Sequence, residues 1–225
     1  MDTQVRTTTQ AQRSQLLIEG PAGQIEITMD MPAEPAEIKG VALVSHPQPL
    51  LGGTPRHIVP HTLAKNLCAD GWIAVRPAFR GVGRSDGTYA QGIGEAEDTL
   101  AVIAHMRSVF PDLRLALVGF SFGAYVYARA ACQLEQTQPA DTIALMGLPV
   151  GDTAAGRVYE ALPLPARALL IHGQEDTVTP LANVLEWARA EHRPVVVFPG
   201  TDHFFKGCLD GVTHVLLQHL ALQAV

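Results

Sequence analysis

Hydrophobic residues along the chain form short continuous runs, separated by longer amphipathic stretches. Runs rich in Val, Leu, Ile and Ala are typical of strands buried on both faces of a parallel sheet. Six such strands are predicted, at residues 40–45, 73–77, 114–119, 142–148, 168–172 and 194–199. Nearer the N-terminus, residues 15–19 and 24–29 flank Gly-Pro-Ala-Gly and are predicted to form an antiparallel hairpin.

In the stretches between these runs, hydrophobic residues recur at the spacing of helices. Helices are predicted at about residues 55–70, 93–109, 122–134, 181–190 and 207–221. Strands that alternate with helices indicate an α/β fold, a mostly parallel twisted sheet of about eight strands with helices on both faces. Only residues 149–167 separate two of the strands, with room for one short helix at 153–162, so no large cap domain is expected.

Length and composition favour a single compact domain. The 225 residues suffice for one substantial core, assigned to residues 14–225 after a flexible N-terminus at 1–13. That N-terminus is polar and shows no secretory signal, and no run approaches the roughly 20 apolar residues of a spanning helix. A cytoplasmic location is therefore expected. The net charge of −6 does not indicate binding to nucleic acid or to an anionic membrane, which basic surfaces favour.

The cysteines indicate neither a disulfide framework nor a metal site. Cys68, Cys132 and Cys208 are far apart, odd in number and without zinc spacing. No metal and no organic cofactor are expected.

The most informative motif is Gly-Phe-Ser-Phe-Gly at residues 119–123, between a predicted strand and a predicted helix. A G-x-S-x-G in this context is the signature of a nucleophile elbow, which lifts the serine hydroxyl out of the sheet. The helix that follows also directs its first N–H groups to the place where an oxyanion would develop. The motif predicts Ser121 as a nucleophile; the simpler alternative is a turn in which Ser121 caps a helix.

Groups that could activate this serine follow two later strands. Glu175 and Asp176 lie just beyond the strand at 168–172, and His203 lies just beyond the strand at 194–199. Functional groups in open parallel sheets gather at the carboxyl ends of the strands. The order serine, acid, histidine is also the order found in hydrolases built on a nucleophile elbow.

The chain resembles the α/β-hydrolase superfamily, and within it small bacterial serine hydrolases akin to dienelactone hydrolases. The resemblance is carried by residues 45–54, 79–85, 119–123, 172–176 and 200–203, so it spans nearly the whole chain. It implies Ser121 as nucleophile, His203 as general base and then acid, and Asp176 as the group that orients His203. Dienelactone hydrolases use a cysteine nucleophile, so the serine here favours ordinary ester chemistry.

Other acids and histidines compete for these roles. Glu175 neighbours Asp176, and Asp152 follows the strand at 142–148, where some members of the superfamily keep their acid. Asp202 is interpreted as a loop acceptor, and His172 as a structural residue at the end of a strand. The remaining histidines outside the motif at 45–54 lack matching partners and are given no role: His57, His61, His105, His192, His214 and His219.

An oxyanion hole needs two donors. The backbone N–H of Phe122 is predicted as one. Gln48 N–H is predicted as the other, with Leu50 as the alternative, because the prolines at 47 and 49 have no N–H. A rigid loop without chemistry is the competing interpretation.

An open, shallow substrate site is expected in the absence of a large cap. Some combination of apolar and aromatic residues near the motifs is predicted to line it: Leu50, Phe120, Phe122, Tyr125, Phe204 and Phe205. The segment at 79–85 contains a G-x-G but lacks a third spaced glycine, so it does not indicate a dinucleotide site. Arg80 is interpreted as a structural arginine of that loop.

The expected activity is hydrolysis of carboxylic esters of short to medium acyl length through an acyl-enzyme on Ser121. Thioesterase, peptidase and cofactor-free haloperoxidase chemistry can use the same three residues. A non-catalytic binding protein on this fold is a further alternative. The expected partner is a small ester substrate, with neither nucleic acid nor membrane involved, and a homodimer is an open possibility.

Overall fold

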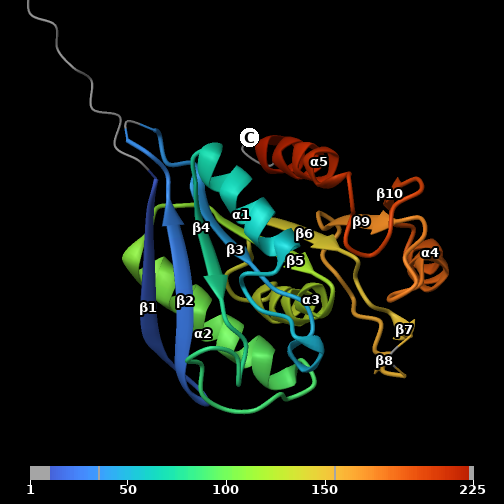
Figure 1. Cartoon of the computed structure of the whole chain (residues 1–225), viewed down its shortest axis with the longest axis horizontal. Helices are drawn as coiled ribbons and strands as arrows, with labels where there is room; N and C mark the ends of the chain where they lie inside the picture. The colour runs from blue at the N-terminus through green and yellow to red at the C-terminus, as the bar shows by residue number, and fades with distance from the viewer. Residues whose placement is uncertain (1–10, 35, 155, 223–225) are drawn as a thin grey trace, which may run out of the picture.

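A single eight-stranded sheet forms the centre of the protein (Figure 1). The structure is a computed structural model and describes residues 11–34, 36–154 and 156–222. In spatial order the strands are β1 (Gln12–Gly20), β2 (Gly23–Met31), β4 (Trp72–Pro77), β3 (Gly40–Val44), β5 (Leu115–Phe120), β6 (Thr142–Met146), β9 (Leu169–Gly173) and β10 (Val196–Phe198). The pairs β1–β2 and β2–β4 are antiparallel, and the remaining pairs are parallel. The predicted α/β class, strand number and N-terminal hairpin are confirmed.

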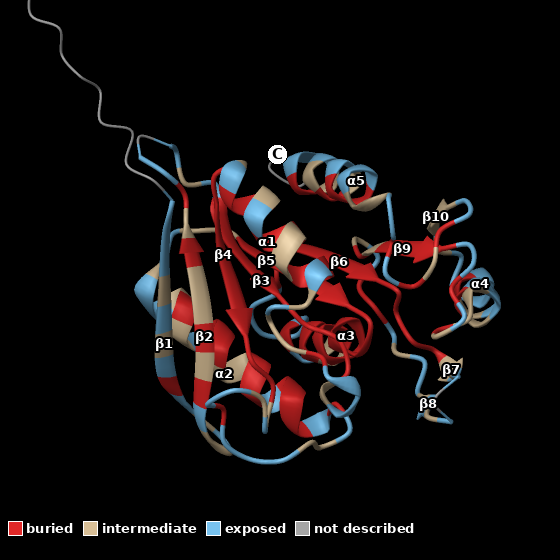
Figure 2. Ribbon diagram, viewed as in Figure 1, coloured by how far each residue is buried: buried red, intermediate tan, exposed pale blue. Residues whose placement is uncertain are grey.

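Helices cover both faces of the sheet because its central strands carry apolar side chains on both faces. In β3, Val41 and Leu43 belong to the hydrophobic cluster beneath α2 (Ile93–Val109) and α3 (Phe122–Leu134). The alternate residues Ala42 and Val44 pack with α1 (Ile58–Ala69) and α5 (Leu209–Leu222) on the other face. Figure 2 shows these central strands as almost wholly buried. The continuous hydrophobic runs in the sequence therefore correspond to strands with a core on each side.

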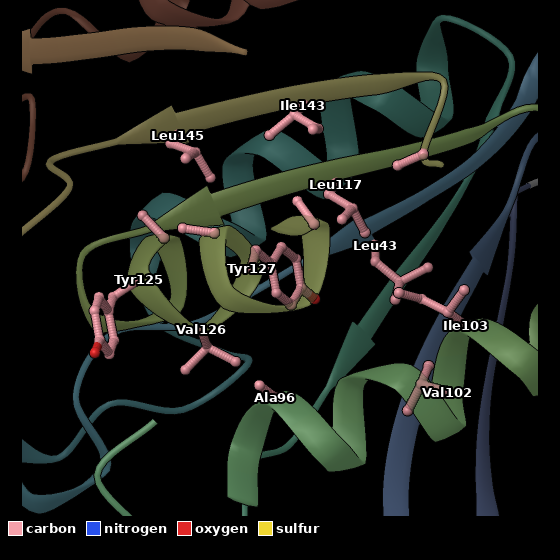
Figure 3. Close-up of a cluster of buried hydrophobic side chains, with 14 of the residues drawn as sticks. Leu43, Ala96, Val102, Ile103, Leu117, Tyr125, Val126, Tyr127, Ile143 and Leu145 are labelled. Carbon is pink, nitrogen blue, oxygen red and sulfur yellow. The ribbon is translucent and has the colours of Figure 1, made fainter. Parts of the chain in front are cut away.

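The cluster under α2 and α3 is the larger one. Figure 3 shows Leu43, Leu117 and Ile143 of the sheet facing Tyr127 of α3, with Val102 of α2 nearby. The short helix α4 (Leu181–Ala190) adds Val184 to this cluster. Together these contacts hold α3, and with it the elbow at its N-terminus, in a fixed position against the sheet.

The helix predicted at 153–162 is wrong. The segment instead forms a small antiparallel sheet of β7 (Gly151–Asp152) and β8 (Val158–Tyr159). Gly151 and Gly156 have φ angles of 65° and 67°, a left-handed conformation that suits a turn and interrupts a helix. Thr153 closes the turn, because its backbone N–H and its hydroxyl both donate to the Arg157 carbonyl.

The predicted boundary between a flexible N-terminus and the domain also needs correction. The first strand begins at Gln12, so residues 12 and 13 belong to the sheet and pair with β2. Residues 1–10 of the predicted terminus lie outside the described residues. In the part of the chain that the structure describes, no helix is both long and apolar enough to cross a membrane.

Candidate active site

The elbow at Ser121 is a strained turn between β5 and α3. Ser121 has φ 57° and ψ −130°, outside the regions ordinarily allowed to residues other than glycine. A Cβ on Gly119 would lie 2.6 Å from the Ala124 Cα, and one on Gly123 would collide with Ser45 and the His46 carbonyl. Glycine is therefore required on both sides of the serine. Such strain costs on the order of 1–3 kcal/mol and is typically stored at functional positions.

The structure brings Ser121, His203 and Asp176 together from three different loops at the carboxyl ends of strands. The Ser121 Oγ lies 2.8 Å from the His203 Nε2, and the His203 Nδ1 lies 2.6 Å from the Asp176 Oδ2. All three residues are buried. This is the arrangement in which a histidine can take a proton from a hydroxyl while a carboxylate orients its ring.

Asp176 is held by a cage of donors. Its Oδ1 accepts the backbone N–H groups of Val178 and Thr179, at 2.9 and 2.8 Å. Its Oδ2 accepts the Thr179 hydroxyl at 2.9 Å and lies 3.2 Å from the His172 Nε2. Burial alone would raise the pKa of Asp176, but the hydrogen bonds from His172 and His203 outweigh it and hold the pKa well below its usual range. The carboxylate is therefore ionised beside His203.

The competing acids lie elsewhere. Glu175 is exposed, and Asp152 is exposed on β7. The Asp202 Oδ1 accepts the backbone N–H groups of Phe204 and Lys206, so its predicted role as a loop acceptor is confirmed. The structure thus brings only Asp176, of these four candidate acids, to His203.

Sequence reasoning missed the two residues that support the acid. His172 was predicted as structural, which its buried bond to the Thr179 carbonyl at 2.7 Å agrees with, but it also reaches Asp176. Thr179 received no role, although its hydroxyl also lies 3.3 Å from the His203 Nδ1. Its position three residues after an acid, before the proline that precedes a helix, is a signal for side-chain bonding within a turn.

The loop after β3 contains Gln48, whose N–H is the predicted second oxyanion donor. Gln48 precedes a single 3₁₀ turn, Pro49–Leu51, and its carbonyl accepts the N–H groups of Leu51 and Gly53. Among the described residues, the Gln48 N–H makes no hydrogen bond. Phe122 is the first residue of α3, and the first N–H groups of a helix have no acceptor within it. Both N–H groups predicted to form the oxyanion hole are thus free to bind a ligand.

The His46 side chain fixes the loop after β3. Its Nδ1 donates to the Pro47 carbonyl at 2.8 Å, and its Nε2 accepts the Phe79 N–H at 3.0 Å. Burial lowers the pKa of His46 to about 3, so the ring is neutral and keeps one donor and one acceptor. A neutral histidine thereby ties the loop after β3 to the loop after β4.

The buried His46 predicts a loss of stability in mild acid. In the unfolded chain His46 titrates near 6.5, whereas in the folded protein it stays neutral to about pH 3. The unfolded state alone takes up this proton below pH 6.5, so the free energy of unfolding falls as the pH falls. The slope should approach about 1.4 kcal/mol per pH unit between pH 6 and 4.5. Urea unfolding at a series of pH values measures it.

A pair of variants isolates the His46 contribution. His46→Gln should flatten the slope, because glutamine does not titrate. His214→Gln, at an exposed position of α5, should leave it unchanged. An unaltered slope in His46→Gln would contradict the assignment.

The residues predicted to line the substrate site differ in their exposure. Leu50 and Phe204 are 58% and 42% exposed, and the Phe204 ring lies 5.2 Å from the His203 ring. Tyr125 is buried on the first turn of α3. Phe120 differs from its predicted place in the lining, because it is fully buried and packs under the His203 ring at 5.2 Å.

Two further aromatic residues predicted to line the site do not line it, and one histidine that was given no role lies near it. Phe122 and Phe205 belong to the core, at 1% and 0% exposed. His57, which received no role, lies near the site, 5.8 Å from the Phe120 ring and 5.4 Å from the Phe204 ring. The signal for it was weak, because a histidine that starts a helix carries no motif.

Arg80 has the structural role predicted for it. Its guanidinium bonds both carboxylate oxygens of Asp98, at 2.6 and 3.0 Å, and one of Glu97. The loop after β4 is thereby tied to α2.

Comparisons with known proteins agree with this geometry. No family model matches the chain. An α/β serine hydrolase homologue from Coxiella burnetii is 34% identical, with 92% of this chain and 97% of that protein covered at a TM-score of 0.78. XC6422 from Xanthomonas campestris, an α/β serine hydrolase without a lid, is 29% identical, with 96% and 97% covered at a TM-score of 0.83. The uncharacterized protein RP471 of Rickettsia prowazekii is 29% identical over 204 residues, 85% of this chain and 82% of that protein.

Proposed function

The chain belongs to the α/β-hydrolase superfamily, among its serine hydrolases, and on that premise we propose that it cleaves carboxylic esters through an acyl-enzyme on Ser121. The observation that carries the proposal is the continuous chain of hydrogen bonds from the Ser121 Oγ through His203 to Asp176, at 2.8 and 2.6 Å. A serine hydroxyl is a poor nucleophile unless a base removes its proton. Here the base is already in contact with it.

The first half of the reaction forms the acyl-enzyme. Because Asp176 accepts a hydrogen bond from the His203 Nδ1–H, the Nε2 has a free lone pair and takes the proton of Ser121. The Ser121 oxygen attacks the ester carbonyl, and the resulting oxyanion accepts the N–H groups of Gln48 and Phe122. His203 then gives its proton to the departing alkoxide, which leaves as the alcohol.

The second half repeats these roles with water. His203 takes a proton from a water molecule as that water attacks the acyl carbonyl, and the same N–H groups hold the second oxyanion. The proton returns from His203 to the Ser121 oxygen as the acyl bond breaks. The carboxylic acid departs and the enzyme is restored.

The surroundings of the site favour esters of short to medium acyl length. The segment after β6 forms only the small β7–β8 sheet. Leu50 and Leu51, on the loop after β3, are 58% and 65% exposed, and Phe204 is 42% exposed beside His203. These side chains offer an open apolar surface for an acyl group.

Hydrolysis of p-nitrophenyl esters from acetyl to palmitoyl tests the proposal. We expect turnover of the short and medium esters, falling steeply toward palmitoyl. A fluorophosphonate should label the protein once, on the peptide that contains Ser121, and labelling should abolish turnover in proportion. A folded protein that neither reacts with the fluorophosphonate nor hydrolyses any of these esters would favour the binding-protein alternative.

A further inference from the structure

A cavity lies beside the proposed active site. It has a volume of about 480 Å³ and is enclosed by three segments: the loop that leads into α2, the first turns of α3, and the β8 end of the β7–β8 sheet. Three tyrosines and two arginines dominate its walls: Tyr89, Tyr125, Tyr159, Arg129 and Arg157. The mechanism proposed above uses none of these side chains.

The cavity is joined to the active site through Gln48. The Gln48 side chain is buried, at 5% exposed, and its Nε2 donates to the hydroxyls of Tyr89 and Tyr159 at 3.3 and 3.4 Å. Its backbone N–H is the proposed oxyanion donor. On the other side Tyr125 lies one helical turn after the nucleophile, and its N–H donates to the Ser121 carbonyl. A substrate held at Ser121 can therefore place another of its groups in this cavity.

Hydrogen-bond donors predominate among the side chains of the cavity, although the buried Gln48 Oε1 beside it is an acceptor without a partner among the described residues. The hydroxyls of Tyr89 and Tyr159 accept from Gln48, and the Tyr125 hydroxyl accepts from Arg129 at 3.1 Å. Within residues 11–34, 36–154 and 156–222, no group accepts the proton of any of these three hydroxyls. Burial raises the pKa of Tyr159, so its hydroxyl keeps that proton at neutral pH.

The charges in the cavity are also unbalanced. Arg129 faces Glu160 at 3.5 Å, but that carboxylate is 71% exposed, and the buried Arg129 Nε makes no hydrogen bond among the described residues. Arg157 forms no ion pair with any described carboxylate. Two guanidinium groups thus face one solvated acid, in a protein whose net charge is −6.

The walls are rigid. The Glu95 carboxylate accepts the N–H groups of Ala90 and Gly92, both at 2.8 Å, and so fixes the loop between them. Gln91 in that loop has a φ of 57°, a strained conformation for a residue other than glycine. The Tyr125 ring, which Figure 3 shows at the edge of the core cluster, packs edge-on against Tyr159 at 4.9 Å. Donors held in place before binding lose little entropy when a ligand arrives.

We infer that this cavity binds a carboxylate carried by the ester substrate, so that the preferred substrates are esters with an acid group remote from the scissile carbonyl. The inference rests on the proposed ester hydrolysis and names its substrate class. A carboxylate offers only acceptors, and its planar oxygens match a guanidinium together with tyrosine hydroxyls. Hydrogen bonds between charged groups of this kind change affinity by about tenfold or more.

A matched pair of aryl acetates tests the inference. 4-Acetoxybenzoate carries a carboxylate where 4-acetoxybenzamide carries a neutral amide of the same shape. We expect kcat/KM for the benzoate to exceed that for the benzamide by about tenfold or more. Arg157→Gln should bring this ratio close to one, and Tyr159→Phe, which removes only a hydroxyl, should lower it several-fold. Arg84→Gln, a change of the same charge at an arginine that is 59% exposed outside this cavity, should keep the wild-type ratio.

A binding measurement separates the inference from the proposed function. 4-Hydroxybenzoate should bind to Ser121→Ala in calorimetry, and adding Arg157→Gln should weaken that binding by about tenfold. If neither acetate is hydrolysed but this Arg157-dependent binding is seen, the carboxylate site stands and the esterase proposal falls. Equal kcat/KM values for the two acetates in the wild type, together with binding indifferent to Arg157, would overturn the inference.

Discussion

Replacing Ser121 with alanine should lower kcat for p-nitrophenyl ester hydrolysis by about 10⁴-fold or more, the scale on which serine hydrolases lose activity without their nucleophile. The Oγ of Ser121 is the protein atom that the proposed mechanism bonds to the substrate, and among the described residues it alone is hydrogen-bonded to the His203 Nε2. The residual rate should come from the two N–H donors alone. Initial rates with p-nitrophenyl butyrate, wild type against variant, measure the loss.

Two further serine variants make this result specific. Ser121→Gly should lose the same activity yet melt at a higher temperature than Ser121→Ala, because glycine adopts φ 57° and ψ −130° without strain. Ser108→Ala, an exposed serine at the end of α2, should retain full activity. Ester turnover that survives in both Ser121 variants would refute the acyl-enzyme mechanism.

Most of the fold follows from hydrophobic spacing. The helices α2, α3 and α4 have the predicted bounds, and each central strand lies within a residue or two of its predicted range. The signal is strong because the central strands are buried on both faces, so their runs are largely apolar, with Arg76, Thr142 and His172 as polar exceptions. The helix predicted at 153–162 failed because Tyr159 and Leu162, the residues of that segment that pack against the core, are only partly buried. There, local turn geometry at Gly151 and Gly156 decides the structure.

The positions of Ser121, Asp176 and His203 were predictable because each follows a recognisable strand within a motif. The residues that hold them were not. Whether Thr179 or His172 reaches Asp176 depends on how the loop at residues 174–180 folds, and spacing alone does not give that. The same holds for aromatic side chains at consecutive positions. Phe204 is exposed beside His203 while Phe205 is fully buried, and a pattern of hydrophobicity does not distinguish them.

One residue links the two functional regions of the molecule. The Gln48 N–H is the proposed oxyanion donor, while its side chain donates to the hydroxyls of Tyr89 and Tyr159 in the neighbouring cavity. The His46 side chain fixes the backbone of the same loop through its hydrogen bonds to Pro47 and Phe79. A group bound to Tyr89 or Tyr159 in the cavity would therefore be linked through Gln48 to the loop that is proposed to stabilise the transition state. Substrate selection and catalysis are expected to share this loop rather than act independently.

Replacing Asp176 with asparagine should lower kcat by about 10⁴-fold while the fold is retained, the size of effect known for the equivalent change in a serine protease. The asparagine amide can donate a hydrogen bond to the His203 Nδ1. The histidine then carries its own proton on Nε2, where it can no longer accept the proton of Ser121. The KM should change little, because Asp176 is buried beneath His203 and contacts no substrate. Steady-state kinetics on a short ester separate the two parameters.

The neighbouring acids provide the controls for this prediction. Glu175→Gln and Asp152→Asn remove exposed carboxylates that sequence reasoning had kept as alternatives, and each should leave kcat within about twofold of the wild type. The expected hierarchy follows from geometry, because only Asp176 lies 2.6 Å from the His203 Nδ1 with its remaining oxygen already bound by two N–H groups. A loss in Glu175→Gln as large as that in Asp176→Asn would move the orienting role to Glu175 and require a different conformation of this loop.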